Sequence, residues 1–509
     1  AVTPLLSTVW NQYEPYNDMC PEINGMRAVT GCVATAMAQV MKKHQWPVSG
    51  TGSYSYVANG ISVSSDFSSH VYDWDNMLDD YYNEYYDLVG TQAQRNAVAQ
   101  LMFDCGVAAR MTYSASESSA MTIAAGGGMT KYFNYDKSME YVLRGWYSDE
   151  DWMRLMHSQI SEGLPVIYAG DSEGGYGHAF ILDGYDGEGY FHFNWGWGGG
   201  SDGYFSLSYN AAPGEDIGYV FNQEALVNIR PDKGSSYLPV MGIEGVFCTT
   251  STEYSCAGDY MELTVENGTG GFYSYALTTM EYEIGVKNTL DGNVVSMGSY
   301  SLDPYYGFRG FGLDSRFFPV GEYDVYLVYK TADTDWTPMK CFVGLTSGRL
   351  HFVNDGTTIT VSEKEEDITV ANQAAYEAVI AEIEALKAEY EGTVAQLKEE
   401  NPDYDFSEWE EIIGGALEMA GTGAAQALAA ANEDGEAFAF AFDGEEIRLM
   451  IDAMIEDVKT SGIEIIENMV SEGKAMIYTL DGRKVASLAR GEVNIIVTPT
   501  STKKVYIRK

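Results

Sequence analysis

The period of the hydrophobic pattern changes three times along this 509-residue chain, and that change most constrains its fold. Residues 1–232 mix helical and strand patterns, 237–362 alternate in short runs, 370–472 repeat at helical spacing, and 475–509 return to alternation. Helices and strands bury their apolar side chains with different periods, so these segments predict separate packing units. The length agrees, because a single core seldom grows beyond about 250–300 residues.

The segment 237–362 reads as a set of short strands. Its clearest runs are ELTVEN, EYEIGVKN, GNVVSMGSYSL, EYDVYLVYK and TTITV, and turn signals separate them. Runs of this spacing with almost no helical period predict a β-sandwich of immunoglobulin-like size. Cys248 and Cys256 lie close enough in sequence to close a small disulfide loop, and free thiols are the alternative.

The helical repeat is clearest over 371–399. Large apolar residues recur there every seven positions: Tyr376, Ile383, Tyr390 and Leu397. One apolar face of this kind must pack on a partner, and 407–420 and 445–470 are the expected partners. The pattern predicts a helical hairpin or bundle used as a spacer or docking face, with a lipid or cofactor groove as the alternative. The tail, 475–509, predicts a small β segment.

The charge balance excludes several classes of partner. Thirty Lys and Arg residues against 74 Asp and Glu residues give a formal net charge of −44. Such a polyanion repels nucleic acid and anionic membrane surfaces. The sequence holds no calcium loop of EF-hand spacing and no CxxC pair of zinc-finger type, so no metal and no cofactor is predicted. No apolar run reaches about 18 residues, so no transmembrane segment is predicted.

The segment TGCVATAMAQVMKKHQWP, residues 30–47, places a cysteine at the start of a helix. Its apolar residues keep helical spacing from Val33 to Met41, and Pro47 closes it. Unpaired backbone N–H groups and the helix dipole favour a thiolate at such a position. Cys32 is therefore a candidate nucleophile. The alternative is a small core residue, because free cysteine is among the most buried residue types.

A candidate general base follows a glycine-rich turn in GGYGHAFILDGYD, residues 174–186. There His178 stands at the mouth of an apolar strand, where it would complete the activation of a nucleophile. On the next strand, FHFNWGWGG, the Asn194 amide is expected to accept a hydrogen bond from the imidazole. Trp195 is expected to shield that bond from water. The alternatives are a histidine bonded to a carbonyl and a tryptophan that only packs the core.

Four motifs in one colinear order resemble the streptopain family of bacterial cysteine peptidases: WNQ…PYN…CP, TGCVATAMAQVMKKHQWP, GHAFILDGYD and FHFNWGWGG…SDGYF. The resemblance covers about residues 1–232 and implies a papain-like domain of the α+β class. It places the nucleophile on Cys32 and the base on His178. It places the pair that supports the histidine on Asn194 and Trp195.

The resemblance also implies which groups bind the substrate. Gln12 and the backbone N–H of Cys32 would hold the oxyanion. Family substrate contacts fall on Ser119 and Gly177. The glycines at 126–128 depart from the family pattern and leave the shape of the specificity loop open.

The expected reaction is hydrolysis of protein or peptide substrates through a Cys32 acyl-enzyme, with His178 as general acid and base. The resemblance implies a hydrophobic residue two positions before the scissile bond. It also implies a secreted or cell-surface bacterial zymogen, of which this chain would be the mature form without its inhibitory prodomain. The tail resembles the β sorting domains of secreted proteins from anaerobic bacteria. Two other classes stay open: an adhesin that uses a papain-like platform, and a Cys–His acyltransferase.

Overall fold

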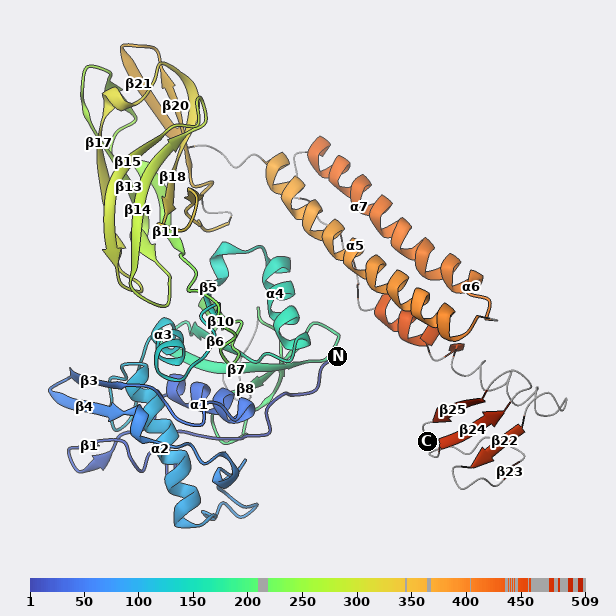
Figure 1. The fold of residues 1–509 in the computed structure, drawn as a ribbon. Helices are drawn as coiled ribbons and strands as arrows, with labels where there is room; N and C mark the ends of the chain where they lie inside the picture. The colour runs from blue at the N-terminus through green and yellow to red at the C-terminus, as the bar shows by residue number, and fades with distance from the viewer. Residues whose placement is uncertain are drawn as a thin grey trace. The chain divides into compact units, whose positions relative to one another are not determined.

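The computed structural model describes residues 1–208, 218–343, 346–363, 368–434 except 403, parts of 438–458, and the backbone of four short strands between 476 and 506. The chain divides into two compact units, Ala1–Glu365 and Glu366–Lys509 (Figure 1). None of the helices in the described part has the length and apolar character needed to cross a membrane.

A six-stranded antiparallel sheet forms the centre of the first segment, residues 1–232. Its strand order is β5 (Glu140–Leu143), β10 (Phe221–Val227), β6 (Val166–Asp171), β7 (Gly177–Tyr185), β8 (Phe191–Asn194) and β9 (Gly203–Phe205). Strands β6 and β7 are almost continuously buried, which explains the apolar runs VIYA and AFIL in their sequences. Two small hairpins lie outside this sheet: β1 (Glu22–Ile23) with β2 (Met26–Arg27), and β3 (Ser53–Ala58) with β4 (Ile61–Asp66).

Helix α1 (Cys32–His44) packs against strand β7 and helix α2 (Gln92–Ala108). Every residue from Val33 to Met41 is buried. Gln45, whose φ of 48° is left-handed, caps the C-terminal end of the helix two residues before Pro47. Helix α3 (Thr122–Tyr132) packs on β5 and β10, and α4 (Asp149–Ser161) packs on β6 and β7.

The second part of unit 1, residues 237–362, is called the two-sheet segment below. One sheet contains β11 (Met241–Thr249), β13 (Tyr260–Ser274), β16 (Gly307–Phe308) and β17 (Gly310–Asp314). The other contains β12 (Glu253–Ser255), β21 (Thr358–Glu363), β20 (Arg349–Asn354), β18 (Gly321–Lys330), β14 (Met280–Asn288), β15 (Val294–Leu302) and β19 (Thr337–Pro338). Apolar side chains of both sheets share one core. Cys248 and Cys256 are free thiols, so the disulfide alternative is excluded.

The two-sheet segment packs directly on the first segment. Tyr275 and Leu277 belong to the core of the first segment, and the ring of Trp146 meets Tyr275 edge-on with centroids 4.8 Å apart. The glycines at 126–128 lie on helix α3 rather than in a loop. A Cβ on Gly127 would lie 2.9 Å from the backbone oxygen of Leu277. Glycine weakens a helix by about 1 kcal/mol relative to alanine, and close approach of another backbone accounts for it here.

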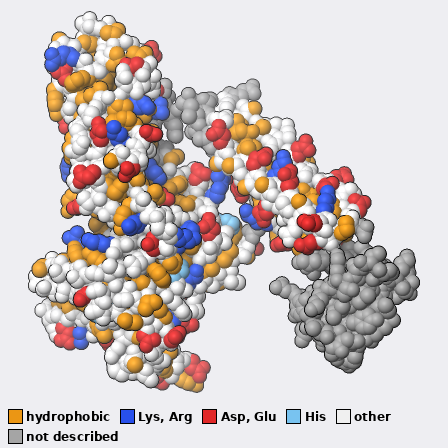
Figure 2. All heavy atoms as spheres, viewed as in Figure 1, with side chains coloured by type: hydrophobic (Ala, Val, Ile, Leu, Met, Phe, Trp, Pro, Cys, Tyr) orange, Lys and Arg blue, Asp and Glu red, His pale blue; other side chains and the backbone are white. Residues whose placement is uncertain are grey.

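Helices α5 (Ile368–Glu400) and α7 (Gly415–Asp434) pack together in the second unit, and α6 (Ser407–Trp409) with a π-helical turn at Glu410–Gly414 precedes α7. Three members of the seven-residue repeat are buried in their core: Ile383, Tyr390 and Leu397. Residues 447–455 are helical, whereas 459–470 of the predicted partner lie outside the described residues. Acidic side chains are prominent on the exposed faces of this helical region (Figure 2). The tail contains the sheet β23 (Lys484–Val485), β22 (Met476–Thr479), β24 (Val493–Val497) and β25 (Thr502–Tyr506).

Candidate active site

Cys32 is the first residue of α1 and is half-buried at the edge of a cleft. The preceding Gly31 has a φ of 86°, and a Cβ there would lie 2.6 Å from the Met111 side chain. Only glycine therefore turns the chain into the helix at this point. Burial raises the pKa of the Cys32 thiol, and the backbone N–H groups of Ala179, Val33 and Cys32 lower it. The predicted stabilisation of the thiolate at the helix start is present, but burial outweighs it.

His178 stands near the start of β7, immediately before the residue whose N–H faces the Cys32 sulfur. Its Nε2 lies 2.9 Å from the backbone oxygen of Trp195. A carbonyl only accepts, so Nε2 donates the proton and Nδ1 is left as the acceptor. Burial lowers the pKa of His178 to about 4, with the Trp195 carbonyl acting in the opposite direction. The imidazole is therefore neutral near pH 7.

The predicted hydrogen bond between Asn194 and His178 is wrong. The buried Asn194 amide instead donates from Nδ2 to the backbone oxygen of Thr8 at 2.8 Å, and its Oδ1 accepts from Gln39 Nε2 at 2.9 Å. The carbonyl of the next residue, Trp195, accepts from the histidine in its place. His178 is thus bonded to a carbonyl through Nε2, and this bond does not decide whether Nδ1 acts as a base.

Asn194 nevertheless acts on the histidine through the backbone. Its Oδ1 also accepts from the N–H of Gly196 at 3.1 Å. That N–H belongs to the same planar peptide group as the Trp195 carbonyl that orients His178. Gln39 lies on α1, the helix that begins with Cys32, so this chain of hydrogen bonds links the two candidate catalytic residues.

Aromatic rings surround the imidazole, and the nearest is not the predicted one. The ring of Trp197 stacks on His178 with centroids 4.6 Å apart, compared with 5.2 Å for Tyr219 and 6.0 Å for Trp195. Trp195 is fully buried and contributes through its backbone, since its N–H donates to Asp202 Oδ1 at 2.9 Å. The motif WGW contained the signal for Trp197, but nothing in the sequence says which tryptophan faces the histidine.

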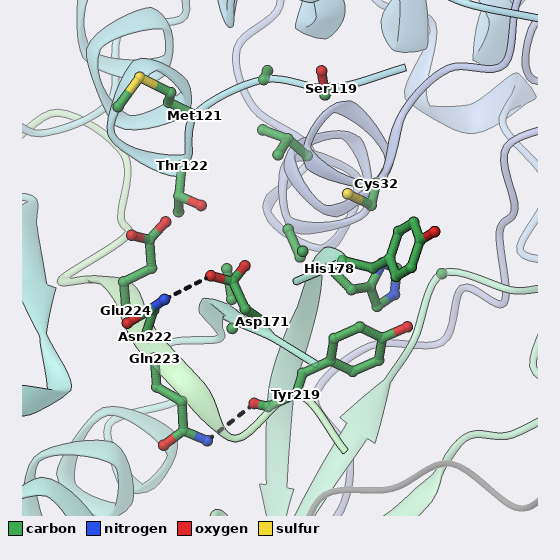
Figure 3. A pocket seen from close by; sticks show the side chains of 18 of the residues that line it. Cys32, Ser119, Met121, Thr122, Asp171, His178, Tyr219, Asn222, Gln223 and Glu224 are labelled. Atoms are coloured by element: carbon green, nitrogen blue, oxygen red, sulfur yellow. Dashed lines mark hydrogen bonds between the residues drawn. The ribbon is translucent and has the colours of Figure 1, made fainter. Parts of the chain in front are cut away.

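A cleft of about 1500 Å³ opens over these residues (Figure 3). Five of the seven predicted site residues line it: Gln12, Cys32, Ser119, Gly177 and His178. Asn194 and Trp195 do not line it. Sequence reasoning missed the lining residues that the two-sheet segment contributes, which are Glu244, Gly245, Tyr305 and Phe342. No sequence pattern connects those positions to the catalytic motifs.

The match to a known protein family lies within the first segment of the chain. The sequence model of the Peptidase C10 family matches residues 10–205. Streptopain of Streptococcus pyogenes serotype M1 is 34% identical over 245 residues, which cover 44% of this chain and 60% of streptopain. The thiol protease/hemagglutinin PrtT of Porphyromonas gingivalis is 30% identical over 285 residues, which cover 52% of this chain and 32% of that protein.

Among solved structures, active wild-type interpain A cysteine protease of Prevotella intermedia is 40% identical, with 44% of this chain and 93% of that chain covered and a TM-score of 0.41. The chain thus spans about 60% of the length of the streptopain that it matches. The family match covers residues 10–205, the segment that holds Cys32 and His178. Residues 10–205 therefore match the Peptidase C10 family of cysteine peptidases, the family that the streptopain-like motifs of this chain predicted.

Proposed function

We propose that this chain is a cysteine endopeptidase that cleaves proteins through an acyl-enzyme on Cys32. The observation that carries the proposal is the placement of Cys32 beside His178 in one cleft. The sulfur faces the N–H of Ala179, the residue that follows His178. The imidazole bonds the Trp195 carbonyl through Nε2, so Nδ1 is the ring nitrogen that can accept a proton. A thiol next to a neutral base is the arrangement that nucleophilic catalysis requires.

The reaction begins when His178 Nδ1 takes the thiol proton and the Cys32 sulfur attacks the scissile carbonyl carbon. The C–N bond then breaks, and the imidazolium gives its proton to the leaving amine. Water, deprotonated by the neutral imidazole, attacks the thioester and releases the acid. Burial disfavours both charged forms before substrate binds, so the attraction between thiolate and imidazolium must offset that cost.

Gln12 is the proposed partner of the Cys32 N–H in binding the oxyanion. Its backbone oxygen accepts from the N–H of Thr30 at 3.1 Å, which holds the N-terminal segment against the residues that precede α1. The side chain is half-buried and lines the cleft. Ser119 and Gly177 line the same cleft and are the proposed contacts for the substrate backbone.

The proposed substrates are extended or partly unfolded protein segments, because a peptide must lie along an open cleft to reach Cys32. A location outside the cell and synthesis as a bacterial zymogen are part of the proposal and rest on the resemblance to streptopain. Immunodetection in cell-free culture medium of the producing bacterium tests the location.

The test of activity uses a denatured fluorescent protein substrate with wild type, Cys32→Ala and Cys248→Ala. Cys248 is a half-buried thiol of the two-sheet segment that does not line the cleft, so its variant serves as the matched control. Wild type and the control should release new amino termini, and Cys32→Ala should lose at least about 1000-fold in rate. Hydrolysis that persists in purified Cys32→Ala, or incorporation of an added amine in place of hydrolysis, would overturn the proposal.

A further inference from the structure

The cleft extends from the catalytic residues onto the two-sheet segment. In Figure 3, Cys32 and His178 lie on one side of the pocket, and Glu224 and Asp171 lie toward the other. Glu224 is on β10 of the first segment. Residues Glu244 and Tyr305 of the two-sheet segment line the same cleft, so both segments contribute to its walls.

Close packing fixes the position of this second wall. The rings of Tyr141 and Tyr275 stack with centroids 6.1 Å apart, one from each segment. The N–H of Val343 donates to the backbone oxygen of Gly145 at 2.8 Å. A Cβ on Gly145 would lie 2.9 Å from the ring of Phe342, just as a Cβ on Gly127 would meet Leu277. At both contacts a side chain on the first segment would collide with the two-sheet segment, so glycine is what permits this close packing.

The chemistry of the shared region is anionic and rich in hydroxyl groups. Tyr141 donates its hydroxyl to Glu224, and Tyr275 donates to Glu244 Oε1 at 2.6 Å. Tyr305 donates to the same carboxylate at 3.2 Å. Burial raises the pKa of Glu224, hydrogen bonds with Tyr141 and Thr122 lower it, and the charges of Asp171 and Glu244 raise it. A positive charge placed among these carboxylates would relieve their repulsion.

We propose that Glu244, with Tyr305 beside it and Glu224 in the same region of the cleft, forms a subsite for a lysine or arginine side chain of the peptide substrate. The two-sheet segment is thereby a specificity-determining part of the enzyme. The subsite lies away from the scissile bond, so it acts on substrate choice and not on the chemical step. This inference rests on the proposed peptidase function, because it assigns the cleft to a peptide.

The test compares peptides that differ in one side chain. Arginine and citrulline have nearly the same shape, and only arginine is charged, so the ratio of their kcat/KM values reports the charge alone. Each position from the second to the fifth before the scissile bond is varied in turn. Wild type should favour arginine at one position by about ten-fold, the size expected when a charge pair forms in a partly desolvated site.

Glu244→Gln keeps the size of the side chain and an acceptor oxygen, and it should bring that ratio most of the way toward one, with Glu224 accounting for the remainder. Tyr305→Phe should reduce it by less, because the carboxylate remains. Glu253→Gln changes an exposed residue of the same segment that does not line the cleft, and its ratio should equal that of wild type. Adding salt should lower the wild-type ratio.

An active enzyme with equal arginine and citrulline rates, or a preference that Glu244→Gln leaves intact, would overturn this inference while the peptidase function stands. If wild type hydrolyses none of the peptides and a peptide-based electrophile does not label Cys32, the function and the inference both fall.

Discussion

The two walls of the cleft are built in different ways. The wall of the first segment holds Cys32 and His178 through a chain of buried hydrogen bonds that runs through Gln39 and Asn194. The wall of the two-sheet segment is positioned by ring contacts and glycine contacts, and its polar group Glu244 meets tyrosine hydroxyls. Bond-making groups must be held to within about 0.5 Å, whereas selecting a side chain tolerates looser placement. This difference agrees with the two proposals, in which the first wall carries out the chemistry and the second selects the substrate.

The largest effect is expected at the base. His178→Ala should lower kcat by about 1000-fold, because neither the thiol proton nor the leaving amine then has a partner for proton transfer. Steady-state kinetics on a peptide substrate measure it. The control is His351→Ala in the two-sheet segment, where the imidazole pairs with Asp324. A similar loss in both variants would mean that folding, and not catalysis, was affected.

A smaller loss of kcat is expected at Asn194, which does not touch the histidine but holds the peptide group that does. Asn194→Ala should lower kcat by about 10- to 100-fold with little change in KM, because the peptide that presents the Trp195 carbonyl loses its anchor at Gly196. Asn354→Ala is a matched control, since Asn354 also donates to a backbone oxygen, at 2.9 Å, and accepts from a glycine two residues later. Both variants should lose stability. Equal kcat values in Asn194→Ala and Asn354→Ala would mean that the hydrogen bonds of Asn194 have no special role in catalysis.

The pH dependence should reflect the buried imidazole. Burial lowers the pKa of His178 to about 4, so the ring is neutral above that pH and protonated below it. A protonated ring cannot accept the thiol proton, and kcat/KM should fall as pH decreases through about 4, by about ten-fold per pH unit. An acidic limb near pH 6.5 would instead indicate a solvent-exposed histidine. The profile of Glu244→Gln should keep the same limb.

The smallest effect should appear at the contact that positions the second wall. Gly127→Ala would raise the stability of an isolated helix by about 1 kcal/mol. Here the new Cβ lies 2.9 Å from the Leu277 oxygen, so we expect a lower melting temperature. Gly421→Ala in α7 has nothing within 4 Å of the added carbon and should stabilise the second unit. Stabilisation by Gly127→Ala would show that the two-sheet segment does not pack there in solution.

The sequence predicted the local elements of the site better than their connections. A helix that begins at Cys32 and ends before Pro47 followed from spacing and from its glycine and proline boundaries. The strand that holds His178 followed from an apolar run after glycines. Such signals are local, so one segment contains all of the information that they need.

The connections could not be predicted because they depend on backbone geometry and on distant segments. Asn194 is a polar residue beside the histidine motif, yet a carbonyl of the next residue takes the predicted role. Every residue has a backbone carbonyl, so the sequence does not indicate which carbonyl accepts a hydrogen bond from the histidine. The glycines at 126–128 departed from the family pattern, and their reason is a contact with Leu277 that no local pattern encodes.

The most direct test of the central claim is to identify the residue that a peptide-based thiol electrophile modifies near pH 7, by mass spectrometry of the digested protein. The chain contains six cysteines, and Cys248, Cys256 and Cys341 are half-buried like Cys32. The account predicts stoichiometric modification of Cys32 with loss of hydrolysis, and much slower modification of Cys32 in His178→Ala. Modification of other cysteines while Cys32 remains unmodified and hydrolysis continues would contradict it.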